Sequence, residues 1–160
     1  MRNIKLQEMS LEDYNNYTDS AIKSYTEELL LSRRFKTLIE ASKFAKLEYN
    51  DLFKEGFQTK DIFLYNIIIG EEKIGIIWFI KERCWGFIGD FLIYEQYRGN
   101  NYGYNTLFLL EDIAKKKGIN ELRLGVFRHN VKARRLYLKV GYKILKAGKK
   151  NFTMSKKLTK

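Results

Sequence analysis

The segment Tyr97-Arg98-Gly99-Asn100-Asn101-Tyr102-Gly103-Tyr104 joins an apolar stretch that predicts a strand (87–94) to an apolar-periodic stretch that predicts a helix (104–117). A strand that enters a helix through a glycine-bearing turn leaves the first helical N–H groups without intrahelical partners, at the positive end of the helix dipole. Such a terminus favours an anion, and Arg98 adds a forked cation suited to phosphate oxygens. The segment therefore predicts a phosphate- or pyrophosphate-binding turn. A plain connection, in which Gly99 and Gly103 only let the chain turn, is the alternative.

The composition indicates an ordinary globular domain. The chain has 160 residues, of which 45% are hydrophobic and 31% charged, and it contains no proline. That length suits one domain, which we take as residues 1–160. The longest apolar run, 76–80, is far shorter than the roughly 20 residues of a membrane span. Because Cys84 is the single cysteine, no intrachain disulfide can form, and we expect a reducing cytoplasm.

The net charge of +11 is unevenly distributed along the chain. Residues 1–80 carry 11 Lys and Arg against 13 Asp and Glu, whereas residues 81–160 carry 19 against 6. The basic half also contains the predicted phosphate turn, so the overall field favours a polyanionic ligand. A compositional bias that places lysines on a solvated surface would explain the same charge.

Hydrophobic periodicity predicts a mixed α/β domain. A short strand at 4–9 precedes two helices, the first opened by a capping box of Ser10 and Asp13, the second spanning 35 to about 53 with Leu38, Ala41, Ala45 and Leu52 on one side. The remaining elements follow in the order of three strands (62–69, 73–80, 85–94), a helix (104–117), a strand (121–127), a helix opened by Asn130, and a closing hairpin (142–146, 152–158). The strand, helix and strand around the opening segment predict a right-handed crossover between parallel strands.

The second half of the chain resembles the GNAT superfamily of acetyl-CoA-dependent N-acetyltransferases. The family signature Gln/Arg-x-x-Gly-x-Gly/Ala, often seen as Tyr-Arg-Gly-x-Gly-x-Gly, is matched at Arg98, Gly99 and Gly103. Asn101 stands where the family usually has glycine, and asparagine is the residue that best replaces glycine in a left-handed backbone conformation. Glu95 stands where proline is common. The segments from Asn130 to Tyr142 and 152–158 are similar to the family's last helix and strand.

The resemblance implies a fold and a cofactor, acetyl-CoA as acetyl donor. The fold would be α/β (α+β), with a mixed, mostly antiparallel central sheet, helices on both faces and a splayed parallel strand pair. Residues 1–60 would form the acceptor side and residues 61–160 the sheet and the acetyl-CoA-binding core. The pyrophosphate would lie on the turn and the pantetheine arm along the free strand edge, which implies contacts with Leu92, Ile93, Tyr94, Arg98, Gly99, Asn100, Asn101, Tyr102, Gly103, Tyr104 and Asn130. Asn130 is equally consistent with a simple helix N-cap.

The reaction needs a proton acceptor and a proton donor, because an ammonium must lose a proton before it attacks a thioester and the departing thiolate must gain one. The resemblance places the general acid at Tyr137, for which a core tyrosine is the alternative. Asp90 is the only carboxylate within its predicted strand, so we take it as the candidate base, with a buried structural aspartate as the alternative. Glu27, Glu28 and Glu82 are lesser candidates. Cys84 is not favoured as a nucleophile, His129 is interpreted as a loop residue, and no Cys/His cluster predicts a metal site.

The sequence favours transfer of an acetyl group from acetyl-CoA to a primary amine of a small molecule or peptide, by direct attack in a ternary complex. The alternatives are a basic nucleic-acid-binding module, against which no RNP1-like motif counts, and an inactive CoA-binding sensor. We interpret the tyrosines of the first helix mainly as core residues, although the tyrosines and the slight acidity of the first-half helices would suit a cationic amine or a peptide amino terminus. The acceptor stays unidentified, and the oligomeric state is open, with a homodimer as one option.

Overall fold

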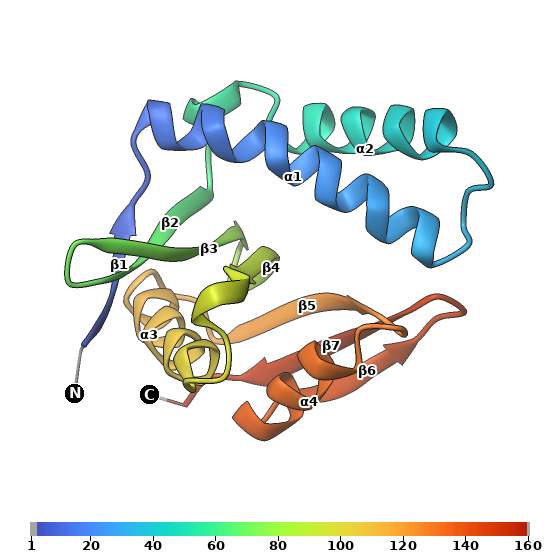
Figure 1. The fold of residues 1–160 in the computed structure, drawn as a ribbon. Helices are drawn as coiled ribbons and strands as arrows, with labels where there is room; N and C mark the ends of the chain where they lie inside the picture. The colour runs from blue at the N-terminus through green and yellow to red at the C-terminus, as the bar shows by residue number, and fades with distance from the viewer. Residues whose placement is uncertain (1–2, 160) are drawn as a thin grey trace.

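The computed structural model describes residues 3–159 (Figure 1). The elements follow in chain order as β1 (Ile4–Glu8), α1 (Leu11–Leu31), α2 (Leu38–Leu52), β2 (Ile62–Ile69), β3 (Glu72–Glu82), β4 (Trp85–Ile93), α3 (Tyr102–Lys116), β5 (Glu121–Phe127), α4 (Val131–Val140), β6 (Lys143–Ala147) and β7 (Asn151–Lys157), with short 3-10 turns at Gly56–Gln58 and Glu95–Tyr97. None of the described helices is both long and apolar enough to cross a membrane.

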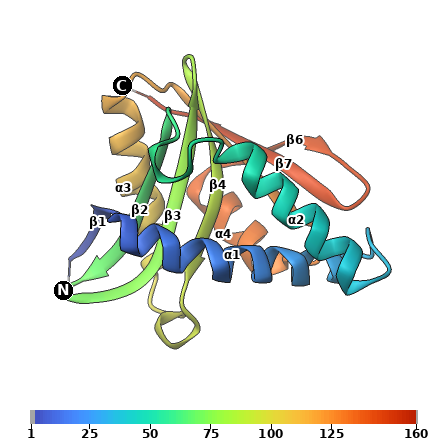
Figure 2. The same ribbon diagram turned by 90° about the horizontal axis from the view of Figure 1, so that it is seen from above.

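The strands form a seven-stranded sheet in the order β1-β2-β3-β4-β5-β7-β6. All neighbours run antiparallel except β4 and β5, which are parallel and joined through α3. The predicted class, a mostly antiparallel mixed sheet with one parallel pair, is confirmed. Figures 1 and 2 show β4 and β5 side by side at one end and diverging toward the other.

Helices cover both faces of the sheet, as predicted. On one face α1 packs Tyr14, Tyr17 and Ala21 against a cluster that includes Leu64 and Trp78. On the other face α3 and α4 bury a larger core, formed by residues such as Leu107, Leu110, Ala114, Tyr137 and Val140 with the inward side chains of β2, β3 and β5. Neighbouring residues of a strand point to opposite faces of a sheet. Since helices cover both faces, the residues of β2 and β3 that point to either side are apolar.

The first helix is anchored by its N-terminal cap. The Ser10 hydroxyl accepts a hydrogen bond from the Asp13 backbone N–H, and the Asp13 carboxylate accepts one from the Ser10 backbone N–H, which confirms the predicted capping box. Asp13 does more than cap. It also accepts hydrogen bonds from Asn66 at 2.8 Å and Lys73 at 2.6 Å, which tie α1 to β2 and β3.

The prediction for the second helix was partly wrong. The helix begins at Leu38 with Thr37 as its N-cap rather than at Phe35, and of its predicted apolar stripe only Ala41 and Ala45 are buried, whereas Leu38 is 63% and Leu52 38% exposed. The small alanines pack against Leu29 of α1. The two helices approach through these alanines, and the larger apolar residues of the stripe are left at the surface.

The network around Asp13 makes a testable contribution to stability. Hydrogen bonds from Lys73 and the Ser10 backbone hold the pKa of Asp13 well below its ordinary value of 3.8. We therefore expect Asp13→Asn to lower the free energy of unfolding by about 1–2 kcal/mol at neutral pH. A carboxylate with a lowered pKa stabilises above its unfolded pKa and loses that contribution as the pH falls, so the difference from the parent should narrow between pH 7 and pH 3 in urea titrations. A difference independent of pH would contradict this assignment.

Candidate active site

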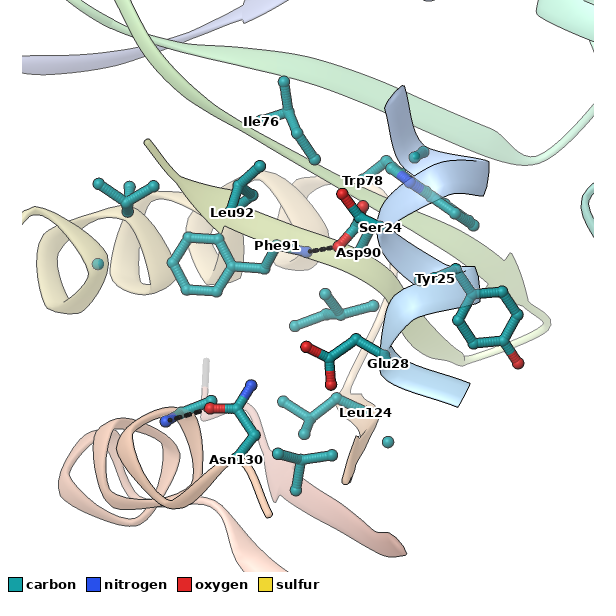
Figure 3. A pocket seen from close by; sticks show the side chains of 18 of the residues that line it. Ser24, Tyr25, Glu28, Ile76, Trp78, Asp90, Phe91, Leu92, Leu124 and Asn130 are labelled. Carbon is teal, nitrogen blue, oxygen red and sulfur yellow. Dashed lines mark hydrogen bonds between the residues drawn. The ribbon is translucent and has the colours of Figure 1, made fainter. Parts of the chain in front are cut away.

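One large cleft of about 1450 Å³ runs between the first-half helices and the divergent strands. α1 and α2 form one wall, and the opposite wall comes from β4, β5, the turn before α3, and α4. Figure 3 shows α1 passing beside Asp90 of β4, with Glu28 placed between Asp90 and Asn130 at the start of α4. The cleft therefore lies where the two halves of the sequence meet.

The cleft exists because β4 leaves β5 midway along its length. The parallel register runs from Trp85 opposite Glu121 to Ile88 opposite Leu124, and the paired residues end there. At the same point the register with β3 slips, so that Trp78 lies opposite Asp90 and Phe79 opposite Ile88, which leaves Gly89 as the extra residue of a β-bulge. The residues that follow on β4 lie against β3 on one side, and on the other side no strand within residues 3–159 pairs with them.

The position of the Trp78 ring requires glycine at residue 89. A Cβ atom added there would overlap the ring of Trp78, which is only 1% exposed. The bare backbone of Gly89 thus lets the indole lie flat against the bulge. This close approach fixes both the bend of β4 and the direction of the Trp78 ring.

A chain of hydrogen bonds leads from Trp78 to Asp90. The indole Nε1 donates to the Tyr17 hydroxyl at 2.7 Å, and that hydroxyl donates to Asp90 Oδ2 at 2.6 Å. The Phe91 backbone N–H donates to the other carboxylate oxygen at 2.8 Å. Burial raises the pKa of Asp90 above its ordinary 3.8, an effect that the bonds from Tyr17 and Phe91 only partly offset. Burial and the nearby carboxylate raise the pKa of Tyr17 well above 10, so this phenol stays protonated.

Tyr137 also reaches the cleft from α4. The side chain is 7% exposed and packs near Phe91 and Tyr142. The hydrogen bonds among residues 3–159 include none to its hydroxyl, although the residue lines the cleft. Burial and the charge of Asp90 raise its pKa, which keeps the phenol protonated at neutral pH. Tyr137 thus combines a core ring with an unpaired donor group at the cleft.

The opening segment forms the far end of the cleft. Asn101 is the N-cap of α3 and has φ of 60° and ψ of 15°, the left-handed conformation expected of a residue that replaces glycine. Gly99 also has a positive φ of 84°. Gly103 plays a different part, since a Cβ atom there would meet Leu136 at 3.0 Å, so its absence allows α3 and α4 to approach closely.

Side chains of the turn are tied to its own backbone. Arg98 Nε donates to the Ile93 carbonyl at 2.8 Å, and the amide of Asn100 donates to the Tyr97 and Arg98 carbonyls. The first helical hydrogen bond of α3 runs from the Asn105 N–H to the Asn101 carbonyl. The N–H groups of residues 102–104 precede it and belong to the open helix end. Arg98, Lys132 and Lys139 line this end of the cleft and make it cationic.

Asn130 has the capping role that the sequence left open. Its Oδ1 accepts a hydrogen bond from the Ala133 N–H at 3.2 Å and so caps α4. Figure 3 shows the amide nitrogen turned toward the cleft, on the side of Glu28. Capping therefore occupies the oxygen and leaves the NH₂ group directed at the space beside β4.

The remaining candidates are spread more widely. Leu92, Ile93 and Tyr94 line the cleft beyond the bulge, together with Tyr102 and Tyr104 of α3, whereas Glu27, Glu82 and Cys84 do not line it and are exposed. Residues 3–159 contain no group of three or more His, Cys, Asp or Glu side chains placed to hold a metal ion.

Sequence reasoning missed part of the acceptor-side wall. Tyr17, Tyr25 and Tyr49 line the cleft as well as packing, and Glu28 meets His129 through a hydrogen bond across 101 positions of sequence. The interpretation of the first-helix tyrosines as mainly core residues was thus too narrow, since Tyr17 is both buried and part of the cleft wall. Tyr17 and Tyr25 sit eight residues apart on one face of α1 with Ala21 between them, and this spacing was the available signal.

Comparison with known families agrees with this geometry. Residues 23–142 match the Acetyltransferase (GNAT) family. The chain belongs to the GNAT family of acetyltransferases. The resemblance drawn from the turn and the last helix is therefore confirmed. GNAT enzymes take the acetyl group from acetyl-CoA, and the open strand edge and the cationic turn of this structure suit such a donor.

Two relatives extend the match over nearly the whole chain. An uncharacterized N-acetyltransferase of Bacillus subtilis, YycN, is 32% identical over 160 residues, covering 97% of this chain and 99% of its own. The crystal structure of YycN superimposes with a TM-score of 0.87 and covers 91% of this chain and 96% of its own. The PaiA N-acetyltransferase of Thermoplasma acidophilum, solved in complex with coenzyme A, shares the fold with a TM-score of 0.72 at 24% identity, covering 97% and 99% of the two chains.

The Gly89–Trp78 contact predicts a sharp difference between two glycines of the GNAT cleft. Gly89→Ala forces its methyl group into the Trp78 ring, so we expect a loss of about 1–3 kcal/mol in unfolding free energy, as in overpacked cores, together with altered tryptophan fluorescence. Gly125→Ala on β5 is the matched control, because a Cβ there meets only Phe87, at 3.9 Å. Equal effects of the two substitutions, measured by urea unfolding, would contradict the proposed constraint.

Proposed function

We propose that this GNAT acetyltransferase transfers an acetyl group from acetyl-CoA to a primary amine of a small molecule or peptide, by direct attack within a ternary complex. The observation that carries the proposal is the free edge of β4 beyond Gly89. This edge lies in the same cleft as the side chains of Asp90 and Tyr137. Residues 1–60 form the acceptor side and residues 61–160 the donor side. The single cysteine excludes an intrachain disulfide, which suits a reducing compartment such as the cytoplasm.

The donor would be held by backbone and charge together. The open N–H groups at residues 102–104, with those of Gly99, Asn100 and Asn101, would bind the pyrophosphate, and Arg98 would supply a cation whose Nε is already fixed on Ile93. The pantetheine amides would pair with Leu92 and Ile93 as an added strand. The Tyr94 N–H donates to Ile74 and its carbonyl accepts from Tyr97, so Tyr94 would contact the arm only as a residue that lines the cleft. The free NH₂ group of Asn130 would donate to the same arm from the opposite side.

Asp90 is placed to receive the proton that the amine must lose. An alkylammonium has a pKa of about 10, so its proton needs an acceptor before the nitrogen can attack. The carboxylate of Asp90 lies beside the free edge of β4, and Tyr17 and Phe91 hold its orientation. Its raised pKa brings its basicity closer to that of the amine, and a general base works best when its pKa approaches the working pH.

Tyr137 is placed to meet the leaving group. The amine nitrogen forms a bond to the thioester carbonyl carbon, the carbon–sulfur bond breaks, and the sulfur leaves as a thiolate that takes up a proton. The unpaired hydroxyl of Tyr137 would donate to that sulfur. Its raised pKa keeps the phenol protonated until negative charge develops on the sulfur. Water would then return the proton that the phenol gives to the thiolate, and the excess proton of the ammonium would leave through Asp90 to solvent.

Binding of acetyl-CoA is the first test of the proposal. Isothermal titration should show saturable binding of acetyl-CoA at micromolar concentrations. No binding at millimolar concentration would overturn the donor assignment.

The turn predicts how substitutions at Asn101 affect that binding. Asn101→Val places a β-branched residue in a left-handed conformation that costs about 1–2 kcal/mol, so the affinity for acetyl-CoA should fall about tenfold. Asn101→Gly should keep the affinity within about twofold. A valine variant that binds as well as the parent would show that the turn does not hold the pyrophosphate in this conformation.

The two catalytic candidates separate in thiol-release kinetics. Tyr137→Phe should leave the Kd for acetyl-CoA unchanged and lower kcat about 100-fold or more. Asp90→Asn keeps an acceptor for the Tyr17 hydroxyl, and it should lower kcat at neutral pH while the residual rate rises with pH, since more of the amine is then already neutral. If Asp90 were only structural, the asparagine variant would lose thermal stability and keep the parent's pH profile.

A further inference from the structure

The cleft has two ends of opposite charge. The donor end carries Arg98, Lys132 and Lys139, which come from the turn before α3 and from α4. The acceptor end, formed by α1, α2 and β4, is lined by the carboxylates of Glu28, Glu48, Asp51 and Asp90. Among the described residues the only Lys or Arg lining that acceptor end is Lys73, and Asp13 already neutralises it at 2.6 Å.

An independent feature shows that this cleft is shaped for a ligand. The side chain of Tyr137 is 93% removed from solvent (7% exposed), and its hydroxyl reaches the same space without a hydrogen-bond partner among residues 3–159. The hydroxyl is not itself buried, so it is free to donate to a molecule in the cleft. The acidic end is continuous with this site, so its charges act on the molecule that reacts there.

Glu28 lies between the reaction centre and the acidic end. The carboxylate meets His129 Nε2 at 2.5 Å, and the imidazole stacks on Phe127. Figure 3 shows this carboxylate directed into the cleft, below Asp90 and above Asn130. A carboxylate offers about four acceptor sites, so His129 fixes its position and leaves room for a second donor.

Glu48, on the facing helix α2, is a second carboxylate at the acidic end. It accepts a hydrogen bond from the Tyr25 hydroxyl at 2.5 Å, and the Tyr25 and Tyr49 rings lie 6.1 Å apart beside it. Aromatic faces attract ammonium groups and pack against methylene chains. The guanidinium of Arg34 stacks on Phe44 at 4.4 Å and does not line the cleft.

The spacing of these groups along α1 sets the scale of the acceptor. Tyr17 holds Asp90, and Tyr25 and Glu28 follow eight and eleven residues later on the same side of the helix. With a rise of 1.5 Å per residue, Tyr25 and Glu28 lie about 12 and 16 Å from Tyr17 along the helix axis. The acidic groups are thus spread along the cleft wall, and a molecule that reaches from Asp90 to the farther ones needs a chain of several atoms.

We propose that the acceptor is a linear diamine or polyamine, whose reacting nitrogen lies beside Asp90 and whose second ammonium is bound by Glu28 and Glu48, against the rings of Tyr25 and Tyr49. This inference rests on the proposed acetyl transfer and names its acceptor class. One nitrogen is acetylated, and the other keeps its charge throughout. Acceptors that carry a carboxylate near the amine are disfavoured, because four carboxylates repel them.

The wild-type enzyme provides the first test. Initial rates of thiol release from acetyl-CoA are compared for α,ω-diamines of three to eight carbons, for spermidine, and for n-alkylamines of the same lengths. We expect kcat/KM for the best diamine or for spermidine to exceed that of the matched alkylamine at least tenfold, with the difference in KM. Equal values for diamine and alkylamine would overturn the inference while leaving the acetyl transfer intact.

Two variants locate the second ammonium. Glu28→Gln and Glu48→Gln should each raise KM for the diamine about tenfold, with a much smaller change in KM for the matched alkylamine. Glu27→Gln is the matched control, since Glu27 neighbours Glu28 but does not line the cleft, and it should change neither. A fall in kcat for both amines in Glu28→Gln would make Glu28 part of the proton transfer instead and would overturn its assignment.

Calorimetry of amine binding tests the acceptor class without relying on the acetyl transfer. In the presence of saturating desulfo-CoA, a diamine should bind at least tenfold more tightly than its alkylamine, and Glu48→Gln should abolish the difference. This measurement requires no turnover. Failure of acetyl-CoA to bind would count against the proposed function, whereas donor binding without a preference for diamines would count against the acceptor class alone.

Discussion

The contact between the Trp78 indole and the bare backbone of Gly89 is the constraint on which the rest of the cleft depends. A sheet that continued its ladder would pair β4 with β5 along their whole lengths and leave no unsatisfied edge. The bulge at Gly89 ends the pairing after Ile88 and Leu124. The unpaired backbone that results would be a liability in most proteins, and here it is the surface on which an extended donor arm can be bound.

The same indole links the two halves of the chain. Trp78 lies on β3, its N–H orients Tyr17 of α1, and Tyr17 orients Asp90 of β4. Because Tyr17 donates to the carboxylate and receives from the indole, each bond polarises the next. The position of the candidate base is thus set by the packing of the acceptor-side helix, and an acceptor that shifts α1 would also shift Asp90.

Local signals in the sequence predicted the helices, the strands and their caps. The side-chain pairs that the sequence could not predict are contacts between residues far apart in the chain. The capping box at Ser10, the helix cap at Asn130 and the left-handed Asn101 each depend on residues within three or four positions, and all are present. The partners of Tyr17 and Glu28 lie 73 and 101 positions away, and no periodicity encodes such pairs. The predicted apolar stripe of α2 was partly wrong for a related reason. Periodicity does not distinguish the alanines that pack against α1 from the leucines of the same stripe that face solvent.

The net charge of the whole chain does not show that the two ends of the cleft carry opposite charges. A net charge of +11 describes the donor side, where phosphates must be neutralised, but the acceptor side brings four carboxylates to the same cavity. Substrates of opposite charge can then approach from opposite ends without competing for one field. The boundary between the two fields falls where β4 leaves β5, beside Asp90 and Tyr137. A cationic amine and an anionic thioester carrier are therefore drawn toward the same few ångströms of strand edge, and this arrangement favours a direct transfer between them.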